Sequence, residues 1–382
     1  MKNYYPRVLE NVVKKYLETF SVIGITGPRQ SGKTTMLKEM FDTSYRYISF
    51  DDYRLIEFFY DDPEKFIKQF ADKVIFDEVQ KVPEIFNYIK IAVDADRDNK
   101  GKFVITGSSQ FSFIQKITES LAGRIGLLTL LPFQYAEIPQ NLRYDSIYKG
   151  CYPEIIKSKF KNYLNWYSSY LETFVLKDVK SLINIGDLRD FRQFIKLLAS
   201  QTAQILNMSG LSRTLGISVS TVKRWISVLE AAYIIFLLPP YFSNLGKRII
   251  KSPKVYFYDT GLVSLLTGIL NKEVYEQGPM AGNIFENYVI SEIKKKLFHN
   301  ADFSQMFYSR TSNDVEVDLI IEKPNHKEFI EIKKSATFRT GMIKPIEKIM
   351  NKNDIGYLLY EGGEFPYKDN IRIIKYSQYI DE

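Results

Sequence analysis

The chain has 382 residues, of which 45% are hydrophobic and 25% charged, and this composition describes a globular protein long enough for two or three domains. Its 52 lysine and arginine residues against 45 acidic residues give a net charge of +7, a mild excess that is compatible with a nucleic-acid partner without requiring one. The single cysteine, Cys151, excludes an internal disulfide and a cysteine metal cluster, as expected in a reducing compartment.

No segment of the sequence predicts contact with a membrane. The first residues lack the apolar core of a signal peptide. The longest apolar run, residues 231–242, is too short to span a bilayer and is broken by Pro239 and Pro240. We therefore expect a cytoplasmic protein without a membrane partner.

The segment GPRQSGKTT, residues 27–35, lies between a run that predicts a strand and a run that predicts a helix. This order, with the spacing G-x-x-x-x-G-K-T, is that of a P-loop, which binds phosphates. Gly27 and Gly32 allow backbone amides to wrap the phosphates, and Lys33 neutralises their charge. Thr34 supplies a hydroxyl ligand for magnesium. The sequence therefore predicts a site for ATP and Mg2+ formed by Gly27, Pro28, Arg29, Gln30, Ser31, Gly32, Lys33, Thr34 and Thr35.

The segment KVIFDEVQ, residues 73–80, predicts a buried strand that ends in two acids. Carboxylates at the tip of such a strand are exposed to the crevice where a parallel sheet binds its ligand. Asp77 is placed to hold magnesium and Glu78 to polarise the attacking water, a division that hydrolysis needs and mere binding does not. The alternative for Glu78 is an ordinary surface acid. We predict an ATPase in which Glu78 is catalytic.

A third strand, residues 102–107, leads into Ser108 and Ser109. Their hydroxyls fall at the same carboxyl edge of the sheet and suit a role in sensing the γ-phosphate, or one of them caps the following helix. Asp51 and Asp52 end a further strand near the site, where structural caps are the simplest interpretation. The sheet is expected to be parallel.

The segments GPRQSGKTT, VIFDEVQ, VITGSS, SLAGR and LLPF, in this order, resemble a large family of prokaryotic AAA-type (AAA+) ATPases. The resemblance covers residues 1–140 and continues more weakly to the end of the chain. It implies that Ser108 or Ser109 is the residue called sensor 1, and that Arg124 is an arginine finger that reaches into a neighbouring subunit. A homo-oligomer would follow. The alternative for Arg124 is a salt bridge or a phosphate contact within its own subunit.

After residue 140 the pattern becomes helical. Apolar residues recur at helical spacing at Leu164, Tyr167, Leu171, Phe174 and Val175. This pattern predicts a helical lid, residues 141–190, against the nucleotide domain. The preceding GCYPE, residues 150–154, resembles a turn that the same family carries at the entry to the lid, or Pro153 only breaks the helix.

Residues 209–229 predict a helix-turn-helix in which Ser209 caps the first helix and Gly216 makes the turn. The second helix has an apolar stripe of Val222, Trp225, Ile226 and Leu229. Its solvent face carries Lys223 and Arg224, and a basic wing follows with Lys247, Arg248 and Lys251. We predict a winged helix-turn-helix at residues 191–258 that contacts DNA phosphates, and the alternative is a joint between protein parts.

Residues 282–297 predict a helix with an apolar stripe of Phe285, Val289, Ile293 and Leu297. Glu286 stands at the edge of this stripe, where an ionised carboxylate needs a cation or a hydrogen-bond partner. Residues 314–323 and 328–335 predict a strand hairpin joined by the turn PNHK. Because side chains alternate along a strand, Glu331 and Lys333 are expected to share one face.

Asp318, followed after twelve residues by Glu331-x-Lys333 and preceded by Glu286 on a helix, resembles the motif of the PD-(D/E)XK nuclease superfamily. In that chemistry Asp318 and Glu331 bind magnesium and Glu286 completes the metal environment. Lys333 positions or activates the attacking water. The alternatives are a salt bridge between Lys333 and Glu331, or a module that grips DNA or regulates without cleaving.

Together these patterns predict an α/β protein with four parts: a P-loop AAA-type parallel sheet at 1–140, a helical lid at 141–190, a winged helix-turn-helix at 191–258, and an α/β restriction-endonuclease-like domain at 259–382. The function predicted is ATP hydrolysis coupled to an action on DNA. The rival is a nucleotide-switched scaffold or signalling protein with an inactive nuclease-like module. A small-molecule kinase is disfavoured because Glu78 follows Asp77.

Overall fold

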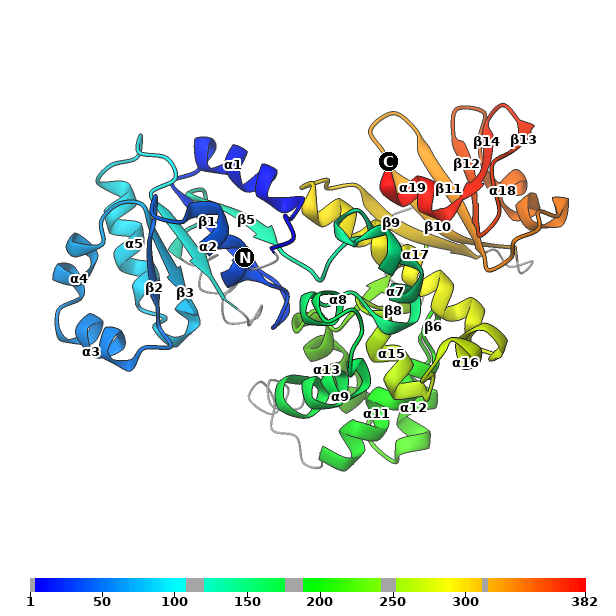
Figure 1. Ribbon diagram of the computed structural model, residues 1–382, viewed down its shortest axis with the longest axis horizontal. Coiled ribbons are helices and arrows are strands. Elements are labelled where there is room, and N and C mark those ends of the chain that lie inside the picture. The colour runs from blue at the N-terminus through cyan, green and yellow to red at the C-terminus, as the bar shows by residue number, and fades with distance from the viewer. Residues whose placement is uncertain (1–3, 108–119, 176–187, 242–251, 311–314) are drawn as a thin grey trace. The chain divides into compact units, whose positions relative to one another are not determined.

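The computed structural model describes residues 4–107, 120–175, 188–241, 252–310 and 315–382 (Figure 1). The chain divides into two compact units. Unit 1 comprises Met1–Phe133, Ala231–Tyr233 and Phe298–Asp302, and unit 2 comprises the remaining residues. Along the chain, the first change of unit comes after residue 133.

Unit 1 contains a five-stranded parallel sheet with the strand order β2-β3-β4-β1-β5. The strands are β1 (Val22–Thr26), β2 (Arg46–Ser49), β3 (Val74–Asp77), β4 (Phe103–Thr106) and β5 (Ile125–Thr129). Its helices are α1 (Leu9–Thr19), α2 (Lys33–Phe41), α3 (Tyr53–Asp61), α4 (Pro63–Gln69) and α5 (Ile85–Asp94). The predicted strand that ends at Asp77 and the parallel sheet are both confirmed. All carboxyl ends of the strands lie at one edge, which is where parallel α/β sheets bind ligands.

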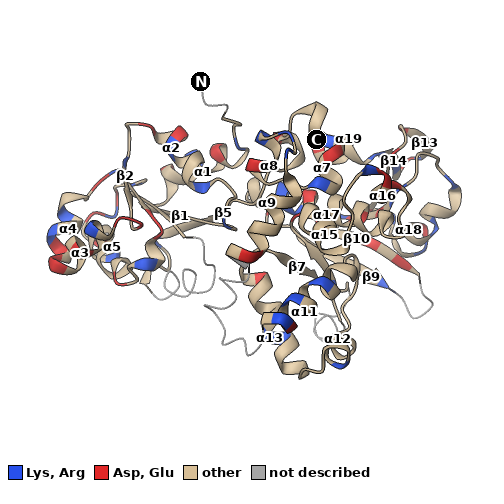
Figure 2. Cartoon of the chain, turned by 60° about the horizontal axis from the view of Figure 1, so that its bottom comes forward, with Lys and Arg blue, Asp and Glu red and all other residues tan. Residues whose placement is uncertain are grey.

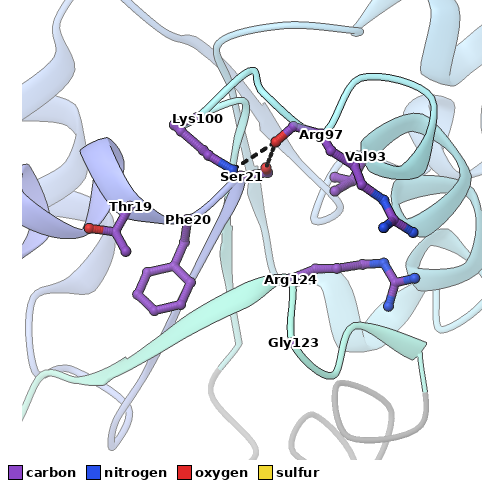
Figure 3. A pocket seen from close by; sticks show the side chains of 8 residues that line it. All are labelled: Thr19, Phe20, Ser21, Val93, Arg97, Lys100, Gly123 and Arg124. Carbon is purple, nitrogen blue, oxygen red and sulfur yellow. Dashed lines mark hydrogen bonds between the residues drawn. The ribbon is translucent and has the colours of Figure 1, made fainter.

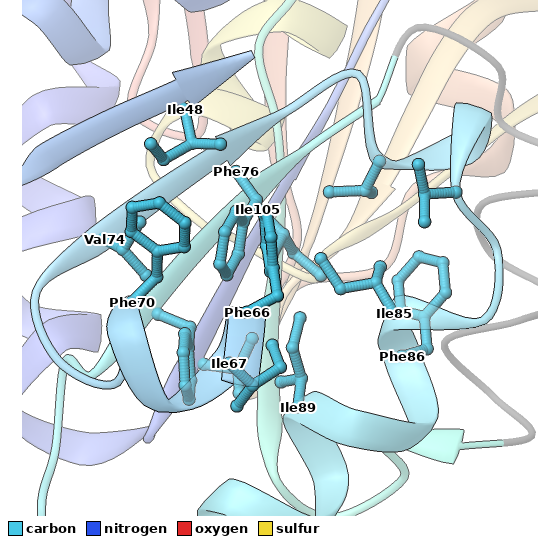
Figure 4. Packing of buried hydrophobic residues seen from close by; sticks show 14 of the residues in the cluster. Ile48, Phe66, Ile67, Phe70, Val74, Phe76, Ile85, Phe86, Ile89 and Ile105 are labelled. Carbon is cyan, nitrogen blue, oxygen red and sulfur yellow. The ribbon is translucent and has the colours of Figure 1, made fainter. Parts of the chain in front are cut away.

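Two hydrophobic cores cover the two faces of this sheet, because neighbouring residues of each buried strand point to opposite sides. Val74 and Phe76 pack with α3, α4 and α5, and Figure 4 shows the aromatic rings of Phe66, Phe70 and Phe76 together in this core. The intervening residues of the strands pack with α1 and α2 in the second core. The sheet is thus covered on both faces, and its edge at the carboxyl ends is left for function.

Unit 2 holds most of the helices. They are α7 (Arg143–Lys149), α8 (Pro153–Lys157), α9 (Tyr163–Tyr170), α11 (Leu188–Ser200), α12 (Met208–Leu215), α13 (Val219–Ala231), α15 (Thr260–Thr267), α16 (Lys272–Gln277), α17 (Ala281–His299), α18 (Lys344–Ile349) and α19 (Tyr376–Asp381). In the predicted lid, α9 continues into a π-helical turn at Leu171–Val175, and residues 176–187 lie outside the described residues.

The two helices of the predicted helix-turn-helix are present as α12 and α13. Gly216 ends α12 in the left-handed region with φ 67°, as expected for the turn residue. The apolar stripe of α13 is buried at Val222, Trp225, Ile226 and Leu229. The predicted cap is wrong: Asn207, rather than Ser209, accepts the hydrogen bond of the Gly210 amide at 2.8 Å. A three-stranded antiparallel sheet of order β6-β8-β7 accompanies these helices, with β6 (Gln204–Ile205), β7 (Ile235–Leu238) and β8 (Lys254–Phe257).

The C-terminal part of unit 2 is a six-stranded mixed sheet of order β13-β14-β12-β11-β10-β9. Its strands are β9 (Gln305–Arg310), β10 (Glu316–Glu322), β11 (Lys327–Lys333), β12 (Ile355–Tyr360), β13 (Phe365–Lys368) and β14 (Ile371–Lys375). The predicted hairpin is confirmed as β10 and β11, which pair antiparallel with Leu319 opposite Ile330. The predicted helix is α17, whose stripe is buried at Phe285, Val289, Ile293 and Leu297. In the described parts of the chain, no helix is both long and apolar enough to cross a membrane.

Candidate functional site

The predicted P-loop connects β1 to α2 at the carboxyl edge of the unit 1 sheet. Gly27 has φ 137° and Gly32 has φ 96°, values that residues with a side chain rarely adopt. A Cβ atom at Gly27 would lie 2.0 Å from the carbonyl oxygen of Leu130, so only glycine fits there. Ser31 is buried, whereas Gln30 and Thr35 are exposed and Arg29 is half-buried. The loop thus has the backbone conformation that its two glycines predict.

Lys33 and Thr34 lie in the first turn of α2. The Nζ atom of Lys33 donates hydrogen bonds to the carbonyl oxygens of Gly27 and Pro28, each at 2.9 Å, so the ammonium lies over the loop. The hydroxyl of Thr34 donates to Oδ2 of Asp77 at 2.7 Å. The two side chains predicted to hold magnesium in this unit therefore meet directly.

Asp77 is buried and has two further side-chain donors that the sequence did not single out. The hydroxyls of Tyr47 on β2 and Thr106 on β4 both donate to its carboxylate. Burial raises the pKa of Tyr47, and its hydrogen bond to Asp77 raises it further. Thr106 ends β4 as Asp77 ends β3, so its position at a strand tip was a usable signal. Ser108 and Ser109, which were predicted to sense the γ-phosphate, lie outside the described residues.

Glu78 follows β3 in a left-handed conformation with φ 59°. This conformation is uncommon for a residue with a side chain, and such residues cluster at functional sites. The Glu78 side chain is half-buried and accepts a hydrogen bond from Gln80. Asp51 pairs with Lys81, and Asp52 caps α3 by accepting from the Arg54 amide at 3.0 Å, which matches the structural interpretation of Asp52.

The P-loop region is also tied to residues far away in the sequence. Arg7 donates to the carbonyl oxygens of Ser31 at 2.8 Å and Leu131 at 2.7 Å. The hydroxyl of Tyr233 lies 2.8 Å from that of Thr26, the last residue of β1. The amide of Leu131 donates to Nε2 of His299 at 3.0 Å. These contacts explain why residues 231–233 and 298–302 belong to unit 1.

Arg124 precedes β5 and therefore lies at the amino edge of the parallel sheet, opposite the P-loop. Its guanidinium donates two hydrogen bonds to Asp94, at 2.8 Å and 2.9 Å, and these bonds hold the pKa of Asp94 below its usual value. Arg124 lines a cavity of about 240 Å³ together with Arg97 and Lys100 (Figure 3). The strand of five residues that separates it from the loop is about 16 Å long. Arg124 therefore cannot touch a nucleotide in its own P-loop without a rearrangement.

The second predicted site gathers in unit 2, where its four residues come from α17, β10 and β11. The register that pairs Leu319 with Ile330 sets Asp318 beside Glu331 on one face of the hairpin. Nζ of Lys333 lies 2.6 Å from Glu331 and 3.3 Å from Asp318. Glu286 and Lys333 both line a pocket of about 490 Å³. The structure thus brings the predicted Glu286, Asp318, Glu331 and Lys333 together. We call Glu286, Asp318 and Glu331, with Glu316, which the sequence motif did not include, the acidic cluster.

Lys254 on β8 joins this cluster, and nothing in the sequence pointed to it. Its Nζ lies 3.1 Å from Glu286, 2.6 Å from Glu316 and 3.9 Å from Asp318. Burial lowers the pKa of Lys254, but the surrounding carboxylates outweigh burial, so the pKa is raised. Burial also raises the pKa of Glu286 to about 7 and of Glu331 to about 8, and the charge of Asp318 adds to both rises. Glu286 and Glu331 are therefore easier to protonate than exposed glutamates.

The acidic cluster does not fit a divalent metal in this structure. Glu286 faces Lys254 and Glu331 faces Lys333, while Asp318 lies within 4 Å of both lysines. Asp318 also accepts the amide of Ile332 at 2.8 Å. Within the described ranges, no group of three or more histidine, cysteine, aspartate or glutamate side chains is placed to hold a metal ion. The residue types of the predicted metal site are present, but their geometry is that of buried ion pairs.

Comparison with known proteins divides the chain into three matched segments. Residues 19–139 match a family model described as "AAA domain". Residues 140–273 and 281–379 match two models described as "Domain of unknown function (DUF8612)" and "Domain of unknown function (DUF4143)". With the P-loop and the parallel sheet, the first match supports an AAA-type ATPase with an α/β fold.

Similar proteins occur in Mycobacterium tuberculosis and Methanocaldococcus jannaschii. The chain is 28% identical over 328 residues to "Uncharacterized protein Rv2008c" of Mycobacterium tuberculosis, covering 85% of this chain and 73% of that protein. It is 25% identical over 362 residues to "Uncharacterized protein MJ1544" of Methanocaldococcus jannaschii, covering 85% and 77%. Among solved structures, the Walker-type ATPase PABY2304 of Pyrococcus abyssi is 14% identical with a TM-score of 0.45, covering 68% of this chain and 94% of that one, a likeness too low to bear on the fold. The match of residues 19–139 to the AAA domain is therefore the comparison that supports an AAA-type ATPase.

Proposed function

We propose that this protein binds and hydrolyses ATP in unit 1 and uses the nucleotide cycle to act on DNA through α12 and α13. One observation carries the ATPase part: Thr34 of the P-loop helix donates to Asp77 at the end of β3, at 2.7 Å. This contact joins the two halves of a nucleotide site that are 43 residues apart in the sequence. The match of residues 19–139 to an AAA domain supports the same assignment.

The residues of unit 1 fit ATP with magnesium. The glycine loop offers a cradle in which a Cβ atom would collide, and Lys33 supplies a cation over it. Thr34 and Asp77 would hold magnesium, which neutralises phosphate charge when bound with the nucleotide. Glu78 follows Asp77 at the strand tip and would orient and deprotonate the attacking water.

We assign Arg124 the role of an arginine finger in a homo-oligomer. Its place at the amino edge, across the sheet from its own P-loop, supports action on the nucleotide of a neighbouring subunit. Asp94 holds the guanidinium with two hydrogen bonds and so keeps it oriented. The alternative is a purely structural ion pair with Asp94.

Arg124→Ala is expected to lower ATP turnover by about 1,000-fold, because such a finger stabilises charge in the transition state. Co-expression of Arg124→Ala and Lys33→Ala subunits should restore turnover to about a quarter of the wild-type value. In randomly mixed oligomers, about a quarter of the interfaces pair a subunit with an intact Lys33 and a neighbour with an intact Arg124. The control is Arg97→Ala, which also removes a contact to Asp94 and should leave turnover unchanged. No recovery in co-assembled oligomers would assign Arg124 to its own subunit.

The DNA part of the proposal rests on α13, whose buried stripe leaves Lys223 and Arg224 exposed. Figure 2 shows basic segments on α11 and α13. The helix order and the three-stranded antiparallel sheet support a winged helix-turn-helix, and the residues of the predicted wing, Lys247, Arg248 and Lys251, lie outside the described residues. A helix with this arrangement suits phosphate contacts along the major groove.

Lys223→Gln/Arg224→Gln is expected to weaken DNA binding by about tenfold and to reduce the salt slope of the affinity by about 2, because two phosphate contacts are lost. Fluorescence anisotropy with duplex DNA across a salt series measures both. The matched control, Lys14→Gln/Lys15→Gln, removes the same charge from exposed positions on α1. If both double variants weaken binding equally, the effect is one of net charge and α13 is not the contact.

A nucleotide-switched scaffold with an inactive nuclease-like module is the second candidate. The observation that favours it is the acidic cluster, in which lysines stand beside the carboxylates. This candidate predicts ATP turnover that DNA does not stimulate and no salt-sensitive affinity for DNA. The ATPase assay with and without DNA separates the two.

A further inference from the structure

Lys254 places its ammonium group among three carboxylates of the acidic cluster. Its Nζ atom has oxygens of Glu286 at 3.1 Å, Glu316 at 2.6 Å and Asp318 at 3.9 Å around it. These acids belong to α17 and β10, whereas Lys254 reaches them from β8 of the three-stranded sheet. The lysine is 2% exposed, so its charge is enclosed with theirs.

The charges of the cluster explain why a cation must be there. Glu286, Glu316, Asp318 and Glu331 bring four carboxyl groups together with the ammonium groups of Lys254 and Lys333. Buried carboxylates are strongly destabilising unless cations or hydrogen bonds offset them. Tyr256, two residues along β8, adds a hydrogen bond to Glu286 at 2.7 Å. Strand β8 thus supplies both the charge and a donor on one face.

Lys333 and Lys254 play different parts. Lys333 lies beside Glu331 on β11, and its side chain is 38% exposed and lines the pocket. It is therefore accessible to a ligand that enters the pocket. Lys254 is enclosed and contacts the carboxylates from β8, an element outside the D…E-x-K hairpin. The hairpin is complete without Lys254, so the lysine is an addition to the motif.

We infer that Lys254 is a built-in cation that replaces a divalent metal in the acidic cluster, so that the wild-type protein binds no metal there and the C-terminal part of unit 2 does not cleave phosphodiester bonds by metal catalysis. An ammonium cannot lower the pKa of a bound water as a metal does, and it holds the carboxylates at hydrogen-bond distances, longer than the roughly 2.1 Å of magnesium ligands. Removing the lysine charge should convert the cluster into a metal site. This inference does not depend on the ATPase of unit 1.

The test is manganese binding to the nucleotide-free full chain, measured by electron paramagnetic resonance of free Mn2+. Wild type and Lys254→Arg, which keeps the charge, should both show only weak binding. Lys254→Met should gain one site with an affinity at least tenfold higher, because the side chain keeps its length and loses its charge. Lys254→Met/Asp318→Asn should lose that site again, which locates it in the acidic cluster.

Circular dichroism would show whether Lys254→Met folds. If it does not, Mn2+ binding to the wild type and to Asp318→Asn still tests the inference. One tight Mn2+ site in the wild type that Asp318→Asn abolishes would overturn the inference. So would cleavage of linear, single-stranded or branched DNA by the wild type that Asp318→Ala abolishes. A folded Lys254→Met that gains no site would also overturn it, because the ammonium would then not be what excludes the metal.

Discussion

Lys33→Ala is expected to weaken ATP binding by about 100-fold or more and to reduce ATP turnover to background, the largest effect of any single substitution in the nucleotide site. The ammonium lies over the P-loop, held by the carbonyl oxygens of Gly27 and Pro28 at 2.9 Å. ATP with magnesium would bring its phosphate charges to that place, and alanine leaves them without this cation. Isothermal titration with ATP and magnesium, together with phosphate release, measures both effects.

The control for Lys33→Ala is Lys68→Ala, which removes the same charge from an exposed position on α4. The ATP affinity and turnover of Lys68→Ala should match those of the wild type, because water and salt screen the charge of an exposed lysine. Turnover that persists in purified Lys33→Ala would remove the assignment of the loop as the catalytic phosphate site.

Glu78→Gln is expected to lower turnover by about 100-fold to 1,000-fold while the affinity for ATP changes little, because the amide keeps the shape but not the basicity of the carboxylate. Glu78 stands directly after Asp77 with φ 59°, a conformation that turns the chain sharply at the strand tip. Single-turnover phosphate release and equilibrium binding of ATP separate the two effects. The variant should therefore accumulate in the ATP-bound state.

Glu64→Gln on α4 is the matched control for Glu78→Gln, since Glu64 is exposed and its ion pair with Lys68 lies at the surface. Full turnover in Glu78→Gln would show that another group polarises the water. Equal loss of ATP affinity and turnover would instead show that Glu78 maintains the shape of the site.

The sequence was sufficient for features that depend on local pattern. The P-loop needs glycine at two positions of unusual φ, and the spacing G-x-x-x-x-G-K-T marks both positions in the sequence. The hairpin of β10 and β11 follows from alternation along two short strands, which also places Asp318 beside Glu331. Because these features join residues that are close in the chain, the local pattern of residues is enough to predict them.

Contacts between distant segments were not predictable in the same way. Lys254 meets Asp318, 64 residues further along, only because the fold brings its side chain on β8 to the acids of β10, and no spacing rule links a lysine in a buried strand to that motif. The donors to Asp77 were missed for a related reason, since Tyr47 comes from a neighbouring strand whose register a single sequence does not fix. For Arg124 the sequence left both roles open, and the ion pair with Asp94 is compatible with each.

Residues 231–233 and 298–302 belong to unit 1 although they come late in the chain, so unit 1 is completed late during synthesis. The hydroxyl of Thr26 meets Tyr233, 207 residues later, and the amide of Leu131 meets His299, 168 residues later. A ribosome that adds roughly 5–20 residues each second therefore exposes the ATPase sheet for on the order of ten seconds or more before its last hydrogen-bond partners exist. A fragment that stops at residue 139 would keep the P-loop but lack both Tyr233 and His299.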